Sequence, residues 1–322
     1  AAGLLLLVAA ILSCTDSEKA ITEAFHSLPE LVNEHAVIEG SDTLRPNRLQ
    51  LIGDTLFVSY AGLSRIDMMT PEFEKLGVVP LTDQVDILPT SFHVFDSLIV
   101  VADHSRQVVV IYDRQGKILT SFGTLPDGET PLMPLGLFVY GGIAYVCDIS
   151  SRSILAVSVV NVDGLTEMGE LVLTIPTDTT RGRRMFSASY VTPDGRLLAG
   201  DAGEGKVKVF TCDGRFIYQF DTLQSGLPMA PQAFEYDDLR DPDAIDTTTF
   251  DPSGIKAHGR VHVVDANNGK IHLFNTLGKY IDSYPPDSLL LRPSGIAIDF
   301  SRKNVYIADP ISRRIFVFAY RD

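Results

Sequence analysis

The chain has 322 residues, and 45% of them are hydrophobic, which is enough for a sizeable buried core. Its 41 acidic and 27 basic residues give a formal net charge of −14 at pH 7. A nucleic-acid-binding surface needs a concentrated basic face, so this composition argues against nucleic acid as a partner.

Residues 1–13 predict a signal peptide with a truncated start. The apolar run from Leu4 to Leu12 is too short to span a bilayer as a mature helix. Ile11-Leu12-Ser13-Cys14 then resembles a bacterial lipobox, in which Cys14 would become the lipidated N-terminus. An ordinary signal peptide cleaved nearby is the alternative.

Residues 14–34 would form a polar tether between this anchor and the remaining domain, residues 35–322. We therefore expect a lipoprotein of the cell envelope that faces the periplasm or the cell surface. Its contact with the membrane would be made through the lipid anchor only.

The domain contains five copies of one layout, in which apolar residues precede a small residue and an aspartate, and Ile or Val follows six residues later. The aspartates are Asp103, Asp148, Asp201, Asp265 and Asp309, and a degenerate first copy has Tyr60 in their place. Repetition at a period of roughly 45 residues indicates a repeat architecture. An aspartate that opens a tight turn accepts hydrogen bonds from backbone N–H groups, so these residues predict turns rather than ligand contacts.

Each copy predicts two β-strands joined by a turn, with a further strand before and after the pair. In the last copy the pair is 305–308 and 315–318. Four antiparallel strands make one propeller blade, so six copies predict an all-β, six-bladed β-propeller. The last copy ends at Asp322 after its third strand, and an extended run, 35–40, precedes the first innermost strand, 48–52. We expect the run 35–40 to complete the last blade and close the ring, which removes an exposed edge.

The last blade resembles an NHL repeat, on the residues Pro293-Ser294-Gly295-Ile296-Ala297-Ile298-Asp299, Val305–Asp309 and Arg314–Phe318. Residues 35–322 as a whole are similar to bacterial six-bladed propeller lipoproteins that carry NHL or TolB-like repeats. The resemblance implies a ring with a central channel. It also implies a binding role rather than a defined reaction.

The links between blades are long and variable, at residues 124–134, 176–187, 222–243 and 285–293. Propeller connectivity places them on the same face as the turns between second and third strands. Long irregular connections in a compact domain are usually functional or mobile. We therefore expect the ligand to bind on this long-loop face.

The candidate ligand-binding residues are basic or aromatic: Arg48, Arg183, Arg184, Phe234, Tyr236 and Arg292. Arg183 and Arg184 suit carboxylates, phosphates or sulfates, and the alternative is that they offset nearby acidic residues. Phe234 and Tyr236 offer aromatic surface for a glycan or peptide, or else they hold a long loop in place. Arg48 and Arg292 flank innermost strands at the mouth of the channel.

Other six-bladed rings that the chain resembles include metal-dependent lactonases and zinc-dependent amidoglycolate lyases, which gather ligands around the channel. The corresponding positions here are Arg48, Ser91, Gly136, Ala188, Ala244 and Gly295, which provide no cluster of metal ligands. His262 and His272 lie on neighbouring predicted strands and could approach each other. Cys147 and Cys212 lack the spacing of a metal site or a redox pair. We therefore expect no metal, cofactor or catalytic residues.

The sequence thus favours an exported, lipid-anchored propeller that binds or scaffolds a peptide, glycan or protein partner. The alternative is a hydrolase or lyase with a metal in the channel. A purely structural protein of the envelope is a third possibility.

Overall fold

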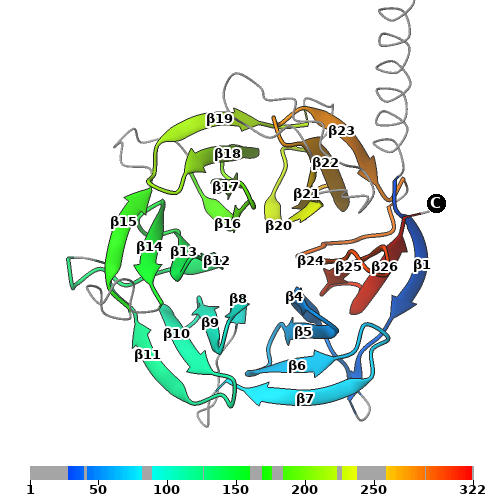
Figure 1. The fold of residues 1–322 in the computed structure, drawn as a ribbon, viewed down its shortest axis with the longest axis horizontal. Helices are drawn as coiled ribbons and strands as arrows, with labels where there is room; N and C mark the ends of the chain where they lie inside the picture. The colour runs from blue at the N-terminus through cyan, green and yellow to red at the C-terminus, as the bar shows by residue number, and fades with distance from the viewer. Residues whose placement is uncertain are drawn as a thin grey trace, which may run out of the picture.

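The structure of the protein is a computed structural model, which describes residues 28–39, 42–81, 89–125, 127–159, 169–175, 184–222, 227–237, 259–286 and 288–320. Six four-stranded antiparallel sheets are arranged around a central axis, and the regular elements in these ranges are all strands (Figure 1). The all-β, six-bladed propeller is therefore confirmed. Within the described ranges there is no helix with the length and hydropathy needed to cross a bilayer.

Each blade is numbered in chain order and runs from its innermost to its outermost strand. The first three blades are β4 (Pro46–Ile52), β5 (Thr55–Tyr60), β6 (Arg65–Met69) and β7 (Lys75–Pro80); β8 (Pro89–Phe95), β9 (Leu98–Asp103), β10 (Val108–Asp113) and β11 (Ile118–Phe122); and β12 (Pro134–Tyr140), β13 (Ile143–Asp148), β14 (Ser153–Ser158) and β15 (Leu171–Ile175). The last three are β16 (Phe186–Val191), β17 (Arg196–Asp201), β18 (Lys206–Thr211) and β19 (Phe216–Phe220); β20 (Pro231–Asp237), β21 (Arg260–Asp265), β22 (Lys270–Asn275) and β23 (Tyr280–Tyr284); and β24 (Gly295–Asp299), β25 (Asn304–Asp309), β26 (Arg314–Ala319) and β1 (Glu30–His35).

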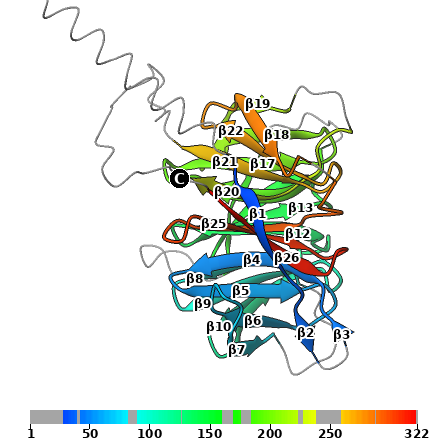
Figure 2. The ribbon, with the colours of Figure 1, turned by 90° about the vertical axis from the view of Figure 1, so that its right-hand side faces the viewer.

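The ring is closed by β1, which pairs antiparallel with β26 from Glu30 opposite Ala319 to His35 opposite Ile315 (Figures 1 and 2). An N-terminal strand therefore completes the last blade, as predicted. The prediction that residues 35–40 form this strand was wrong, because the strand is Glu30–His35. Residues 30–34 belong to the blade rather than to a tether.

The chain after β1 has to travel from the outer rim of the last blade to the channel, and this explains the difference. Val37 and Leu44 are buried between the last and first blades, and the Leu44 N–H donates to Val37 O at 2.8 Å. Between them β2 (Ile38–Glu39) pairs with β3 (Asp42–Thr43). Residues 36–39 and 42–45 thus belong to the crossing and are not available to extend the outer edge.

Hydrophobic side chains form six clusters, each between two adjacent blades. Successive residues of a strand point to opposite faces, so each blade contributes to the cluster on either side. Burial is most complete in the second and third strands, as in β9 and β14, where all six residues of each strand are buried. The core is therefore distributed around the ring and leaves the axis to the innermost strands.

The repeat aspartates form turns, as predicted. Asp309 Oδ1 accepts the N–H groups of Ile311 and Ser312, both at 3.0 Å, within the turn that it opens. Its Oδ2 accepts the N–H groups of Leu291, at 2.7 Å, and Arg292, at 2.9 Å, from the preceding link. Asp148, Asp201 and Asp265 likewise accept a backbone N–H from the preceding link, at Met133, Met185 and Ala230. Among the described residues, Asp103 accepts only from its own turn, through the Arg106 N–H and the Ser105 hydroxyl.

The innermost strand of blade 5 differs from the expected one. The sequence placed Phe234 and Tyr236 in a link and put the counterpart of Gly295 at Ala244, whereas both aromatic residues lie within β20. Ala233 pairs with Val264 as Gly295 pairs with Ala308, so Ala233 is the counterpart. A proline at the start of the innermost strand recurs in blades 1, 2, 3 and 5 and was the available signal.

Candidate functional site

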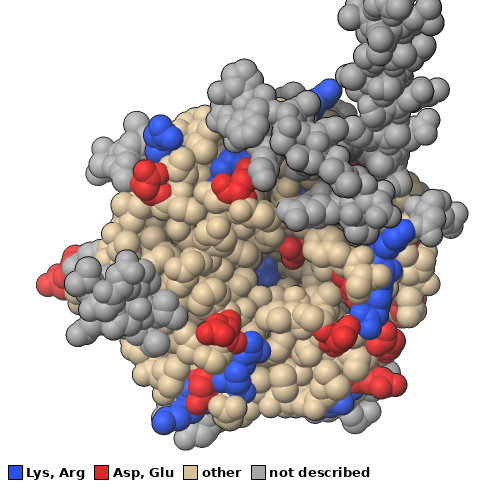
Figure 3. All heavy atoms as spheres, in the orientation of Figure 1, with Lys and Arg blue, Asp and Glu red and all other residues tan. Residues whose placement is uncertain are grey.

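The innermost strands of all six blades surround a central cavity of about 640 Å³. Figure 3 shows the centre of one face hollowed, with a basic and an acidic group visible inside. Its lining includes Gly53 and Asp54 after β4, and Phe300 and Ser301 after β24. An innermost strand begins at a link and ends at the turn to its second strand. The cavity therefore extends away from the long-loop face.

Arg48 lies across the channel near the beginning of β4. Its guanidinium donates to three backbone carbonyls, from Nε to Thr90 O at 3.0 Å, from Nη1 to Gln232 O at 2.6 Å and from Nη1 to Ser294 O. The residues equivalent to Arg48 in blades 2, 5 and 6 are Ser91, Ala233 and Gly295, and each acceptor carbonyl belongs to the residue just before one of them. The Arg48 side chain therefore connects four blades. The residue is 9% exposed, and desolvation lowers its pKa to about 10, which leaves it charged at neutral pH.

The blades approach each other closely at the level of Arg48. A Cβ added to Gly295 would lie 2.7 Å from Asn47 O, and one added to Gly136 would lie 2.4 Å from Ser187 O. Both positions therefore require glycine. Because the counterparts of Arg48 are small, there is room for one long side chain, and Arg48 forms the floor of the cavity.

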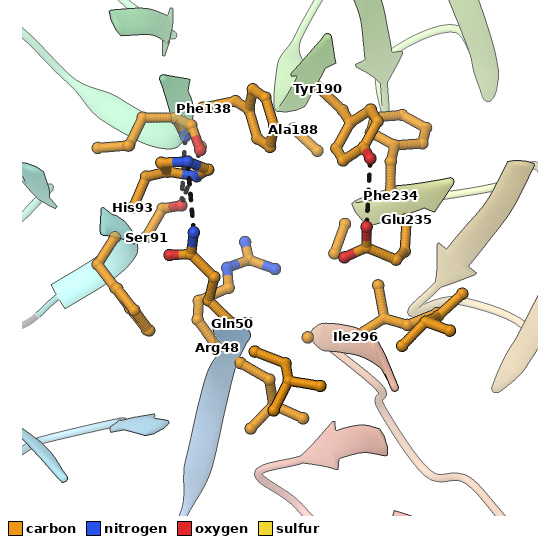
Figure 4. Close-up of a pocket in the computed structure, with 18 of the residues that line it drawn as sticks. Arg48, Gln50, Ser91, His93, Phe138, Ala188, Tyr190, Phe234, Glu235 and Ile296 are labelled. Carbon is orange, nitrogen blue, oxygen red and sulfur yellow. Dashed lines mark hydrogen bonds between the residues drawn. The ribbon is translucent and has the colours of Figure 1, made fainter. Parts of the chain in front are cut away.

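Above this floor, one side chain from each of five consecutive blades contacts the next, and we refer to this set as the channel arc: Gln50, His93, Phe138, Tyr190 and Glu235. Figure 4 shows these side chains around the cavity. All five occupy the same position on the innermost strands of their blades. Each pairs with the second-strand residue that stands three positions before the repeat aspartate, or before Tyr60 in blade 1, as His93 pairs with Val100.

The contacts along the channel arc are polar at its two ends and aromatic in its middle. Gln50 Nε2 lies 3.3 Å from His93 Nε2. The centroid of the His93 ring is 4.4 Å from that of Phe138, which in turn is 4.5 Å from that of Tyr190. The Tyr190 hydroxyl then donates to Glu235 Oε1 at 3.2 Å. In blade 6 the equivalent residue is Ala297, so the arc stops there and Ile296 faces the cavity beside Glu235 (Figure 4).

Burial sets the charge of the channel arc. It lowers the pKa of His93 to about 3, so this imidazole is neutral at pH 7. It raises the pKa of Glu235 to about 7, although hydrogen bonds from Tyr190 and from the Tyr236 N–H oppose the increase. At neutral pH the cavity therefore holds a permanent cation at Arg48 and a carboxyl group close to half ionised at Glu235.

The structure separates the candidate residues of the sequence analysis. Arg48 and Phe234 both line the cavity, but Phe234 is 5% exposed and packs with half-buried Tyr236 between blades 4 and 5. Arg184 precedes β16 and Arg292 precedes β24, so they lie two blades apart. Arg183 and Cys14 fall outside the described residues.

No residue of the channel arc was among the ligand-binding candidates predicted from the sequence, although the sequence carries a signal for the arc. Each member stands two residues after one of the small counterparts of Arg48, or after Arg48 itself. Side chains two residues apart on a strand point the same way. The positions two after Arg48, Ser91, Gly136 and Ala188 would therefore have identified four of the five members.

The histidines of blade 5 do not come together. His262 and His272 lie on neighbouring strands but are not opposite each other in register, because His262 pairs with Leu273. His262 Nδ1 is 2.8 Å from the Tyr284 hydroxyl, and His272 Nε2 is 3.0 Å from Asp265 Oδ2. Within the described ranges, no three His, Cys, Asp or Glu side chains are grouped so that they could hold a metal ion.

No protein-family model matches the chain, and no curated protein matches it in sequence. Among solved structures, a catalytically inactive virginiamycin B lyase from Staphylococcus aureus with quinupristin is similar, with a TM-score of 0.60 at 11% identity over 89% of this chain and 88% of that one. A streptogramin B lyase has a TM-score of 0.60 at 11% identity, over 90% of this chain and 98% of that one. A Bacteroides caccae protein of unknown function has a TM-score of 0.54 at 12% identity, over 79% and 81%. At these identities the likeness shows the propeller fold alone.

Proposed function

We propose that the protein is an exported, lipid-anchored propeller of the NHL or TolB-like kind that acts as a binding module and holds its ligand in the central cavity. The observation that carries this proposal is the cavity itself, which is closed by Arg48 and lined by the channel arc. Its volume of about 640 Å³ falls within the range of roughly 300–1,000 Å³ that is typical of ligand sites. The lipobox-like segment ending at Cys14 supports an anchor in the cell envelope.

The cavity is a better candidate than the long-loop face proposed from the sequence. Arg184 and Arg292 belong to links two blades apart and do not converge. In the cavity, aromatic surface and a few polar groups from five blades converge on one space. A peptide end or a small glycan is slim enough to enter such a space, and a partner protein could present either one.

Capture from an envelope extract tests this proposal. Wild-type protein is dialysed against the small-molecule and peptide fraction, and the retained compounds are identified by mass spectrometry. Phe138→Leu should retain at least about tenfold less, because it removes a ring from the cavity wall. Phe216→Leu is the matched control, since Phe216 is 51% exposed on the outer strand β19. Capture that survives Phe138→Leu but is lost in Arg292→Glu would move the site to the long-loop face.

The second candidate, a channel-metal-dependent hydrolase or lyase, has one specific observation in its favour. Glu235 has a pKa of about 7 and faces the cavity beside the Tyr190 hydroxyl, as a general acid or base would. Stoichiometric zinc or calcium in protein purified without chelator, together with turnover that Glu235→Gln abolishes, would favour this reading over the binding module.

A further inference from the structure

Arg48 has donor capacity that the protein itself does not use. Its Nε and Nη1 are bonded to carbonyls, whereas Nη2 has no hydrogen bond to any residue in the described ranges. Figure 4 shows the guanidinium directed into the cavity. The site is therefore built, with a side chain 91% buried and one nitrogen still open to a ligand.

The charge of Arg48 is also uncompensated. No carboxylate in the described part of the chain forms an ion pair with it, and its three partners are neutral carbonyls. A buried cation without a counter-ion is costly, and an anion that enters the cavity recovers part of that cost. A ligand that carries a negative charge therefore has a defined place to put it.

The remaining lining limits how much negative charge the ligand can carry. Among the described lining residues Arg48 is the one permanent cation, while three carry carboxyl groups. Two of these, Asp54 and Asp299, bind Arg302 at 3.0 Å and 2.9 Å. The third, Glu235, forms no ion pair with any cation among the described residues, and its ionised form would repel a dianion. A monoanion fits this balance better than a phosphate does, and a carboxylate matches the planar guanidinium.

The side walls of the cavity determine the shape and polarity of the uncharged part of the ligand. Neutral His93, Phe138 and Tyr190 provide a continuous aromatic surface on one side. Ile296 and Ile298 line the opposite side from blade 6. A planar apolar group suits the space between these walls, because aromatic rings stack on flat apolar surfaces.

We infer that the cavity binds a small organic carboxylate, whose carboxylate group meets Arg48 Nη2 and whose planar apolar body lies along His93, Phe138 and Tyr190. This inference rests on the proposed binding function and names the chemistry of its ligand. The carboxylate is carried either by a free acid or by the C-terminus of a peptide.

Matched pairs of probes test the assignment on the unmodified protein. Phenylacetate and indole-3-acetate are compared with phenylacetamide and indole-3-acetamide by saturation-transfer NMR and calorimetry. We expect each acid to bind at least about tenfold more tightly than its amide, because the neutral amide can accept a hydrogen bond from the guanidinium but cannot form an ion pair with it. Peptides ending in Phe, with a free or an amidated C-terminus, distinguish the two sources of the carboxylate.

Two variants locate the binding. Arg48→Met should reduce the affinity for the acid to that for the amide, while Phe138→Leu should weaken both probes together, because it changes the wall and not the charge. If Arg48→Met does not fold, the comparison of acid with amide in the wild type still decides the question. Amides that bind as tightly as acids, or acids that do not bind, overturn the inference. The binding function stands in either case if extract capture depends on Phe138, and it fails if that capture is absent.

Discussion

The hydroxyl of Tyr190 donates a 3.2 Å hydrogen bond to Oε1 of Glu235, and this contact joins the innermost strands of blades 4 and 5 at the wall of the cavity. The two residues are 45 positions apart in the chain and meet because they occupy the same position in consecutive blades. The bond stabilises the ionised form of a carboxyl group that burial would otherwise keep protonated.

Removing that hydroxyl should change the ionisation of Glu235. In Tyr190→Phe the carboxylate loses a donor, so we expect its pKa to rise above its value of about 7. The measurement is an NMR titration of the labelled side-chain carboxyl. Tyr218→Phe is a matched control, because the Tyr218 hydroxyl donates to Thr276 O and does not contact Glu235. An unchanged or lower pKa in Tyr190→Phe would contradict the role of this bond.

Glu235 should also make the free energy of unfolding depend on pH. Its folded pKa of about 7 lies above the ordinary value of 4.5, so the folded state binds its proton more tightly than the unfolded state. The associated stability is complete below about pH 4.5 and is lost as the pH rises to about 7. Glu235→Gln should therefore gain roughly 1–3 kcal/mol over the wild type at pH 8 and show little difference near pH 4.5. Urea unfolding of both proteins at the two pH values measures this stability difference, and an equal difference at both pH values would refute the prediction.

Arg48 should contribute to the stability of the whole ring. Arg48→Met would remove the Arg48 donor from the carbonyls of Thr90, Gln232 and Ser294, at a cost of about 1–3 kcal/mol for each one left buried and unpaired. Thr90 O keeps a second donor, Asn47 Nδ2 at 3.4 Å. We expect a total loss of roughly 3 kcal/mol or more in the free energy of unfolding, measured by chemical denaturation. Arg292→Met is the control, since the exposed Arg292 side chain should account for about 0.5 kcal/mol or less. Equal effects in the two variants would argue against the bridging role.

Closure by β1 can be tested by truncation. A chain that starts at Leu28 keeps every residue that pairs with β26, whereas one that starts at Ala36 removes all of β1. We expect the first to unfold at the temperature of the longer chain. The second should unfold at a lower temperature and self-associate, because β26 becomes an open edge. Thermal unfolding and size-exclusion chromatography report the two properties, and identical behaviour of both truncations would rule out closure by β1.

Short-range patterns in the sequence were sufficient to predict six blades of four strands each. In five of the blades an aspartate opens the turn, and this aspartate and the β-branched residues on either side of the turn act within one hairpin. A pattern whose cause lies within a few neighbouring residues can be read from the sequence alone. The need for an N-terminal strand followed from the same reasoning, because the last copy was one strand short.

The location of the closing strand and the channel arc depended on tertiary structure. All of β1 except His35 is exposed, so no apolar alternation marks it, and its pairing is set by the edge of β26. Gln50 and Glu235 belong to one arc although 185 positions separate them, because the ring brings equivalent positions of successive blades together. Arg48 likewise becomes the floor of a cavity only where four blades meet around it. Sequence periodicity specifies which residues are equivalent, and only closure of the ring brings them into contact.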